Sequence, residues 1–332
     1  MAVMRQREDT MAVITLFRRY GTLIGFFAII GFFAWQLPDT FVTPRNLINV
    51  SQQISMLAVV AFTMTIVMVM GDFDLSVGSM ASLAGVVAAV LFAQGFPVWA
   101  GVAAALAVGL VGGLANGFLV SIIGILPFVA TLGTLTILSG VAFVVSDGRT
   151  IFGRDIPSAF SGFARSGISL EPVGLAGLSL PWLTVIALIV LFIVWFVLEQ
   201  TIYGRRLYAI GGNREAAKLA GVKVKRLRMS AFALTGLGAA IAGLMYASRV
   251  ASANPTQGSG LMLDAIAAVF VGMTMSEEGE PRVLATLVGV LILGILDNGL
   301  TQMAVDSYVR EILVGGIVVA AVAFSSLSKQ TR

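Results

Sequence analysis

The sequence predicts an all-α polytopic membrane protein with about ten transmembrane helices, and three observations lead to that fold class. Of the 332 residues, 58% are hydrophobic and 11% are charged, whereas soluble domains are about 45–50% apolar and about 25% charged. Long uncharged runs recur along the chain, each able to supply the roughly 20 apolar residues of one membrane-spanning helix. Basic residues also concentrate in alternate connections between these runs. A soluble globule is excluded, because so few charges could not cover so much apolar surface.

The uncharged runs place the helices in order. We expect the first over 21–37, ended by Pro38, and the second over 46–71. From Leu75 to Ser146 no charge occurs, and this run has the length of three helices, divided at 94–97 and around 121–124. Five further helices are expected over 172–198 (starting near Pro181), 229–248, 261–276, 283–302 and 308–325. The eighth, over 261–276, has the shortest clean run.

Positive charge sets the expected orientation. An even number of helices puts both termini on one side, and placing them in the cytoplasm leaves most of the 21 Lys and Arg residues there. We therefore treat 1–332 as a single transmembrane domain with a cytoplasmic N-terminus over 1–20. Residues 146–180 then form a periplasmic loop, and residues 199–228 form a cytoplasmic loop.

Short polar motifs recur at matching places in the two halves of the chain. Asp74 opens the third predicted helix and Asp264 the eighth, while Asn116-Gly117 closes the fourth and Asn298-Gly299 the ninth. If five helices repeat as five, the second copy crosses the membrane in the opposite sense, which is the inverted-repeat plan of transporters. The alternative is chance, because Asn-Gly is a common turn dipeptide.

The residue types that are absent exclude several kinds of chemistry. The chain has no Cys and no His, which removes Ser–His and Cys–His catalysis and the usual zinc, haem and iron–sulfur ligand sets. No G-x-x-x-x-G-K-[ST] motif occurs, so we expect no ATPase site in this chain. We expect a protein that is not an enzyme, holds no metal or cofactor of its own and binds no nucleic acid.

The segment 204–228 is the most distinctive polar stretch. Asn213 can cap a short helix from Arg214 to Ala220, and Gly221 can end it. Such a helix is too short to be stable alone in water, so it needs a partner surface. The alternative is a basic loop that serves only to orient the chain.

Glu215-Ala216-Ala217, followed by Gly221, resembles the EAA motif of ATP-binding-cassette (ABC) importer permeases. The whole chain from about 45 to 325 is similar to the ribose/xylose-type sugar permease family through six motifs: GDFDLSVGS (71–79), ANGFLV (115–120), LPFVATLGT (126–134), GRRLYAIGGNREAAKLAGV (204–222), LDAIAAVFVG (263–272) and DNGL (297–300). Asp72 departs from the family pattern, which has glycine at that position.

The resemblance implies a multi-pass subunit of the bacterial cytoplasmic (inner) membrane. It would pair with a second permease subunit, identical or different, and work with two ATPase subunits that bind ATP and Mg²⁺ and with a periplasmic solute-binding protein. The residues expected to couple this chain to the ATPase are Gly204, Arg205, Arg206, Asn213, Glu215, Ala216, Ala217 and Gly221.

Polar residues at the edges of the apolar runs are the other candidates. An ionised carboxylate in a membrane is costly and by default functional, so we expect a translocation pathway or hinge at Asp74, Ser76, Asn116, Thr131, Asp264 and Asn298. The alternative is structural: such groups satisfy backbone amides where helices are broken. Both roles stay open.

The predicted function is import of a sugar or similar small polyhydroxylated solute, by alternating access driven by the separate ATPases. One alternative is an ion-coupled secondary transporter, which also uses inverted repeats but needs acid–base partners deep in the membrane. Another is an ABC permease for branched-chain amino acids or nucleosides. The sequence does not select the solute.

Overall fold

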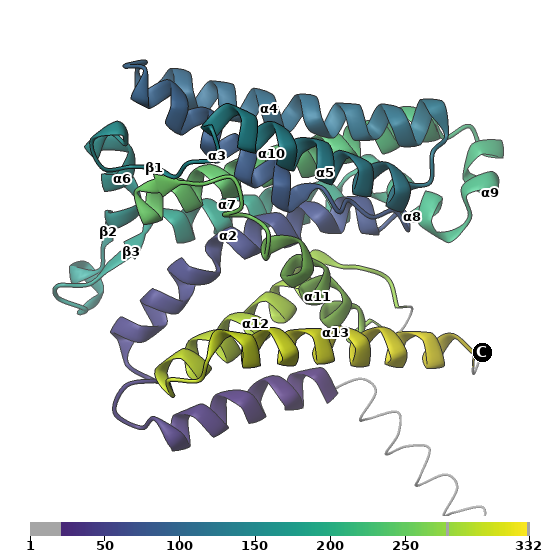
Figure 1. Cartoon of the computed structure of the whole chain (residues 1–332). Coiled ribbons are helices and arrows are strands. Elements are labelled where there is room, and N and C mark those ends of the chain that lie inside the picture. The colour runs from purple at the N-terminus through teal and green to yellow at the C-terminus, as the bar shows by residue number, and fades with distance from the viewer. Residues whose placement is uncertain (1–20, 277–278, 331–332) are drawn as a thin grey trace, which may run out of the picture. The chain divides into compact units, whose positions relative to one another are not determined.

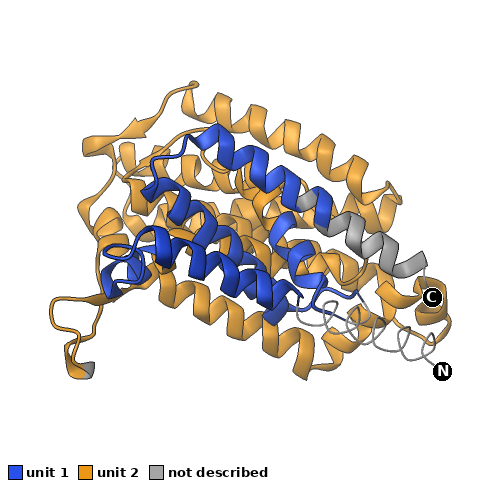
Figure 2. Cartoon of the chain, turned by 90° about the horizontal axis from the view of Figure 1, so that it is seen from below, with its two compact units in different colours: residues 1–50, 266–332 blue, residues 51–265 orange. Residues whose placement is uncertain are grey.

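A computed structural model describes residues 21–276 and 279–330. The chain forms two compact units, each described by itself: residues 1–50 with 266–332 (unit 1) and residues 51–265 (unit 2) (Figure 2). The expected cytoplasmic N-terminus over 1–20 lies outside the described residues.

The described residues are mainly helical (Figure 1). After a first helix, Gly21–Gln36, the main helices are α2 Pro44–Met68, α3 Val77–Ala93, α4 Val98–Phe118, α5 Pro127–Ser146, α6 Ser158–Arg165, α7 Trp182–Trp195, α8 Ile202–Gly212, α9 Arg214–Leu219, α10 Val224–Val250, α11 Leu261–Met273, α12 Val283–Gln302 and α13 Ser307–Gln330. Helices α4 and α7 each end in a π-helical turn, Leu119–Ile123 and Phe196–Gln200. Short 3-10 turns occupy Gly153–Asp155 and Glu171–Val173.

A helix lies over each segment that the sequence predicts to cross the membrane. The two divisions of the long uncharged run are confirmed, because α3 ends at Ala93 and the π-helical turn after α4 ends at Ile123. Within the described residues, six helices are long and apolar enough to span a membrane: Pro44–Met68, Val98–Ile123, Pro127–Ser146, Trp182–Gln200, Val224–Val250 and Val283–Gln302. The 13 residues of α11 rise only about 20 Å, against a hydrocarbon core of about 30 Å. A multi-pass protein is supported, and the number of ten crossings stays a prediction.

Helix α3 forms the centre of unit 2, where α4, α5 and α10 pack against it. Alanine, valine and glycine dominate its sequence, and twelve of its 17 residues are buried. Small side chains suit this position, because helices within a membrane associate through close backbone packing rather than through the hydrophobic effect.

Helices α4 and α10 pack along a stripe of glycines. A Cβ at Gly109 would collide with the Gly236 carbonyl, and a Cβ at Gly113 would collide with the Phe232 carbonyl. One turn further on, a Cβ at Gly117 would lie 2.8 Å from the Cα of Met229. The glycine spacing therefore sets how closely these two long helices approach.

The connections of unit 2 gather at two opposite ends. At one end the α2–α3 loop, the end of α4, the start of α10 and α9 meet through hydrogen bonds among Asp72, Val120, Arg228 and Arg214. At the other end the Ser248 hydroxyl donates to the Phe160 carbonyl at 2.6 Å, which joins α10 to α6. Within unit 2, the predicted cytoplasmic loop 199–228 thus lies at one end and the predicted periplasmic loop 146–180 at the other. Which end faces the cytoplasm stays a prediction.

The long predicted loop 146–180 is largely ordered. Strand β2 (Gly167–Ser169) pairs antiparallel with β3 (Ser179–Pro181), and β1 (Ile151–Phe152) pairs antiparallel with β4 (Ser252–Ala253). Helix α6 between them is held by a hydrogen bond from the Gln52 amide to the Ala164 carbonyl at 2.6 Å. This segment is a folded platform rather than a loose connector.

In unit 1, too, small residues allow two helices to pack closely. A Cβ at Gly289 of α12 would collide with the Ala268 carbonyl of α11, and a Cβ at Gly272 would lie 2.6 Å from the carbonyl carbon of Ala285. The buried ring of Phe33 covers Gly299 and lies 5.4 Å from the ring of Phe41. The short α11 therefore packs tightly against α12 despite its length.

Candidate functional site

The segment between α7 and α10 folds into two short helices with defined ends. The Thr201 hydroxyl accepts a hydrogen bond from the Gly204 amide at the start of α8. The side chain of Asn213 accepts from the Ala216 amide at 2.9 Å and caps α9. Gly221 adopts φ +83° just beyond the end of α9, the left-handed conformation that glycine takes at a helix C-terminus. The predicted cap, helix and terminator are all confirmed.

The residues expected to couple to an ATPase divide into an exposed and a buried set. Arg205, Arg206, Glu215 and Ala216 are exposed. Ala217 is buried and faces the body of the protein. Gly204 is also buried, and any side chain there would collide with the carbonyl of Leu198. Gly204 is therefore needed for packing within the chain and does not lie on the exposed surface.

Leu219, at the end of α9, is a residue that the sequence analysis did not single out. It is 88% exposed. A leucine this exposed buries little apolar surface against the rest of the chain. Together with exposed Ala216 it gives α9 an outward apolar surface.

An ion-pair cluster around Asp72 fastens α9 to the helical bundle. The Arg228 guanidinium donates to both carboxylate oxygens of Asp72, at 2.6 and 2.8 Å, and to the Val120 carbonyl at 3.3 Å. Arg214, the first residue of α9, donates to the same carboxylate at 3.1 Å. Asp72 is 1% and Arg228 is 7% exposed. A charge so deeply buried is tolerated only when it is paired and hydrogen-bonded.

This cluster provides partners for Asp72, the residue that the sequence analysis noted as a departure from the pattern of the family it resembles. The sequence analysis noted Asp72 but missed its partners. The available signal was Arg228 itself, a cation at the edge of the apolar run that becomes α10.

A second contact ties α8 to α10. The hydroxyls of Tyr203 and Ser230 lie 2.9 Å apart. Burial raises the pKa of Tyr203, an effect that the hydrogen bond with Ser230 partly offsets. The phenol therefore stays protonated and keeps this link at physiological pH.

Four of the six expected pathway residues form one buried polar cluster. The Asp74 carboxylate accepts from the backbone amide of Ser76 at 2.9 Å and from its hydroxyl at 2.6 Å. The Asn116 amide reaches both Asp74 oxygens at 3.3 Å and the Ser76 hydroxyl at 2.8 Å. The Thr131 hydroxyl donates to the Phe73 carbonyl at 3.4 Å and to the Pro127 carbonyl at 2.8 Å.

The geometry of this Asp74 cluster suits a structural joint. Asp74, Ser76, Asn116 and Thr131 are each 0% exposed. Their bonds join the α2–α3 loop to the last turns of α4 and, through Thr131, to the N-terminal part of α5. The Asn116 amide oxygen is buried without a hydrogen-bond partner among the described residues.

The other two expected pathway residues lie elsewhere. Asp264 sits in the first turn of α11 and is half-buried. Asn298 of α12 accepts from Asn46 at 3.0 Å and from Gln302 at 2.7 Å. Nearby, Arg310 donates to Asp297, the acid that interrupts this apolar run. The structure thus gathers four of the six into one cluster and places Asp264 and Asn298 outside it.

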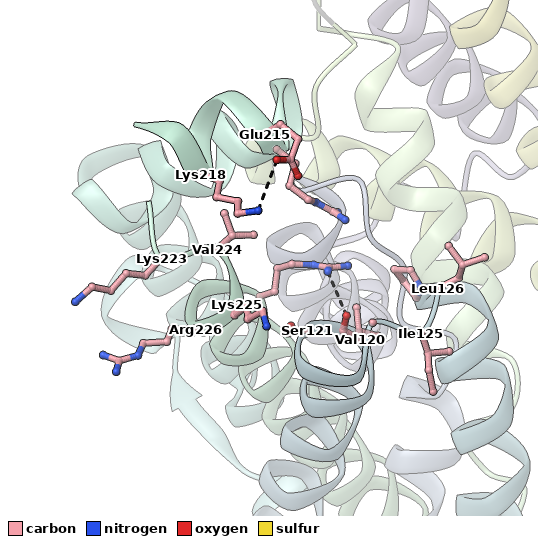
Figure 3. A pocket seen from close by; sticks show the side chains of 14 residues that line it. Val120, Ser121, Ile125, Leu126, Glu215, Lys218, Lys223, Val224, Lys225 and Arg226 are labelled. Carbon is pink, nitrogen blue, oxygen red and sulfur yellow. Dashed lines mark hydrogen bonds and ion pairs between the residues drawn. The ribbon is translucent and has the colours of Figure 1, made fainter. Parts of the chain in front are cut away.

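A cavity of about 560 Å³ opens beside α9 (Figure 3). Its walls come from α9, the start of α10 and the connection between α4 and α5: Val120, Ser121, Gly124, Ile125, Leu126, Pro127, Arg214, Glu215, Lys218, Lys223, Val224, Lys225, Arg226 and Arg228. Among residues 21–276 and 279–330, no group of three or more acidic, His or Cys side chains is arranged to hold a metal ion.

The described residues thus form a bundle of apolar helices with one short, exposed helix, α9, anchored at its base. The chain belongs to the family described as branched-chain amino acid transport system / permease component, whose model matches residues 46–322. The resemblance to sugar permeases of ABC systems is confirmed by individual relatives.

Three relatives illustrate the similarity. The ribose import permease protein RbsC of Bacillus subtilis is 36% identical over 305 residues, 92% of each chain. RbsC of Haemophilus influenzae is 37% identical over 286 residues, 86% of each chain. The L-arabinose transport system permease protein AraH of Escherichia coli is 35% identical over 315 residues, 95% of this chain and 92% of AraH. No solved structure matches the chain.

Proposed function

We propose that this chain is the membrane-spanning subunit of an ABC importer of the bacterial cytoplasmic membrane, moving a sugar or related polyhydroxylated solute inward by alternating access. The sugar permeases among its relatives support the solute class. ATP and Mg²⁺ would bind to partner ATPase subunits. The chain would pair with a second permease subunit, identical or related, to enclose the pathway.

The observation that carries the proposal is the placement of α9. Its outward residues, Glu215, Ala216 and Leu219, are exposed, while Arg214 and Asn213 fix its base and its start. A short helix that is fixed at its base and exposed on its outer side can bind a separate protein and move with it. We infer that this face docks into the ATPase and that the Asp72 ion pairs transmit the movement to the bundle.

The docking role can be tested at Leu219. Leu219→Asp should abolish co-purification of the ATPase subunits and ATP-dependent uptake, because an exposed carboxylate replaces the apolar contact. Since Leu219 is 88% exposed, the full chain should still insert and keep its melting midpoint. Phe96→Asp is the matched control: Phe96 is 50% exposed but follows α3 at the opposite end of unit 2. Normal ATPase association in Leu219→Asp would refute docking through α9.

The folded segment 146–180 offers a surface on which a second partner, the solute-binding protein, could dock. Its exposed apolar side chains, Phe152, Phe163 and Ile168, stand on a platform anchored to α10 through Ser248. We infer that the periplasmic solute-binding protein docks here. Ile168→Lys should weaken binding of that protein while leaving the ATPase attached.

The family description, which refers to branched-chain amino acids, keeps those solutes as a second candidate. Uptake by proteoliposomes holding the whole assembly, supplied in turn with ribose, arabinose and leucine, would decide between the two. Uptake by this chain alone, driven by a proton or sodium gradient without ATP, would refute the importer and support the ion-coupled alternative.

A further inference from the structure

Residues 254–260, between β4 and α11, form a non-helical segment that packs against α3. A Cβ at Gly78 of α3 would lie 2.6 Å from the carbonyl oxygen of Gly258. About two turns further along α3, a Cβ at Gly85 would collide with the side-chain amide of Gln257. The segment therefore lies along the side of α3 and not beyond one of its ends.

This position places the segment at membrane depth. Helix α3 is an apolar helix of 17 residues, which rises about 25 Å and is shorter than a hydrocarbon core of about 30 Å. With α3 crossing the membrane as predicted, a segment beside Gly78 and Gly85 lies within the hydrocarbon layer. The Gly258 amide finds its hydrogen-bond acceptor there in the Ser82 hydroxyl of α3, at 2.9 Å.

One side of the segment is polar and exposed. Pro255 and Gly258 are buried, whereas Thr256, Ser259 and Gly260 are exposed. Non-helical backbone occurs within a membrane only where protein buries it or where it lines a water-filled space, because hydrocarbon offers polar groups no hydrogen bonds. Lipid is therefore excluded as the neighbour of the exposed side, which leaves water or a partner subunit.

The predicted repeat pairs this segment with the loop before α3. Both precede short apolar helices, α3 of 17 residues and α11 of 13. Short or interrupted helices at corresponding positions of two repeats point to the substrate site of a transporter. The two loops differ in access: the polar side chains Asp72, Asp74 and Ser76 are buried, whereas Thr256 and Ser259 are exposed. Of the two loops, the segment before α11 is the one whose polar side chains a solute can reach.

We propose that residues 256–260 line the translocation pathway, and that the Thr256 and Ser259 hydroxyls form hydrogen bonds with the passing solute. Hydroxyls both donate and accept hydrogen bonds, which suits a polyhydroxylated solute. A Cβ at Gly260 would meet no atom beyond its chain neighbours within 4 Å, so the chain leaves open space at this point. The inference rests on the proposed import of such a solute. It places the path of the solute here and not at the Asp74 cluster, whose four members are 0% exposed.

The chain contains no cysteine, so single introduced cysteines can report which positions meet water. The whole assembly, with its ATPase and partner subunits, is placed in nanodiscs and treated with a small charged methanethiosulfonate during ATP hydrolysis. Ser259→Cys is the test variant. Ile189→Cys is the matched control, because Ile189 is 52% exposed and lies in the apolar span Trp182–Gln200. Ile168→Cys, on the exposed platform formed by 146–180, verifies that the reagent is active.

We expect Ser259→Cys to react at least about tenfold faster than Ile189→Cys, because a thiol that faces lipid has a raised pKa and forms little reactive thiolate. If Ser259→Cys fails to react while Ile168→Cys reacts, lipid or the partner subunit covers the segment, and the proposal is overturned. This measurement needs no transport. It therefore stands even if the assembly imports neither ribose nor arabinose, the result that would count against the proposed function.

A second variant tests whether the solute passes this segment. Gly260→Leu puts a bulky side chain into the open space and should lower uptake of ribose or arabinose several-fold, while the melting midpoint and ATPase association stay unchanged. Gly31→Leu is the matched control: Gly31 is an exposed glycine of the helix Gly21–Gln36, and a Cβ there also has open space. Its uptake should be normal. Normal uptake in Gly260→Leu would show that the solute takes another path.

Discussion

Asp72 and Asp74 lie two residues apart in one loop, are both buried, and are stabilised by different means. Asp72 is paired with two arginines, one of them on α9. Asp74 accepts hydrogen bonds from the neutral groups of Ser76 and Asn116. The first carboxylate joins the α7–α10 segment to the bundle, and the second joins helices within the bundle.

This difference indicates that the Asp72 ion pairs and the Asp74 cluster have different roles. An ion pair spanning two segments couples their positions strongly, because separating them leaves a buried charge without a partner. A network of neutral donors around one carboxylate is short-ranged and fixes local helix geometry. We infer that movement of α9 is transmitted to the bundle through Asp72, while the Asp74 cluster fixes the positions of α3, α4 and α5 relative to one another.

The largest expected effect is that of Asp72→Asn. It leaves Arg228, which is 7% exposed, as an unpaired buried cation, and breaking such a pair costs about 3–5 kcal/mol of stability. The apparent melting midpoint of the purified chain should fall sharply. Asp72→Asn combined with Arg228→Leu should recover much of the loss, because the orphan charge is gone. If the double variant were no more stable than the single one, the ion pair would not be the cause.

Asp74→Asn should cost less, about 1–3 kcal/mol, the penalty for mispairing a buried polar group. The new amide would face the Asn116 amide, donor against donor. The charge-swapped pair Asp74→Asn/Asn116→Asp restores a carboxylate beside an amide and should raise the melting midpoint again. A loss as large as that of Asp72→Asn would remove the distinction between the two clusters.

The sequence predicted the features of the fold that depend on neighbouring residues, but not the contacts between residues far apart in the chain. Helix positions followed from uncharged runs, and the cap and end of α9 followed from Asn213 and Gly221, because these signals are local. Asp74 and Asn116 could be singled out as polar residues at apolar boundaries. Their direct contact could not, since it joins residues 42 positions apart, and the Asp72–Arg228 pair spans 156. Tertiary packing decides such contacts, and no local pattern records them.

The two Asn-Gly pairs extend the comparison to unit 1. Asn116 serves a carboxylate that is 0% exposed, whereas Asn298 bonds to the half-buried amides of Asn46 and Gln302. Asn298→Ala should therefore cost only about 1 kcal/mol, because water can replace the lost acceptor. Asn116→Ala should cost more, since its partner Asp74 is 0% exposed. Melting midpoints of the two variants, measured side by side, would check the order. Equal losses of stability would mean that the Asn-Gly pair has the same structural role in both units.

The smallest effect on stability is expected for Arg214→Gln. Its side chain is 43% exposed, and partly exposed ion pairs contribute about 0.2–1 kcal/mol, so the melting midpoint should hardly move. Uptake should nevertheless fall several-fold, because α9 loses its link to Asp72 and its movement no longer reaches the bundle. Lys218→Gln is the matched control: it removes a cation from the same helix, whose pair with Glu215 is exposed on both sides. Full uptake in Arg214→Gln would show that Asp72 stabilises the fold but does not transmit movement. Asp72 and Asp74 would then differ only in how much they contribute to stability.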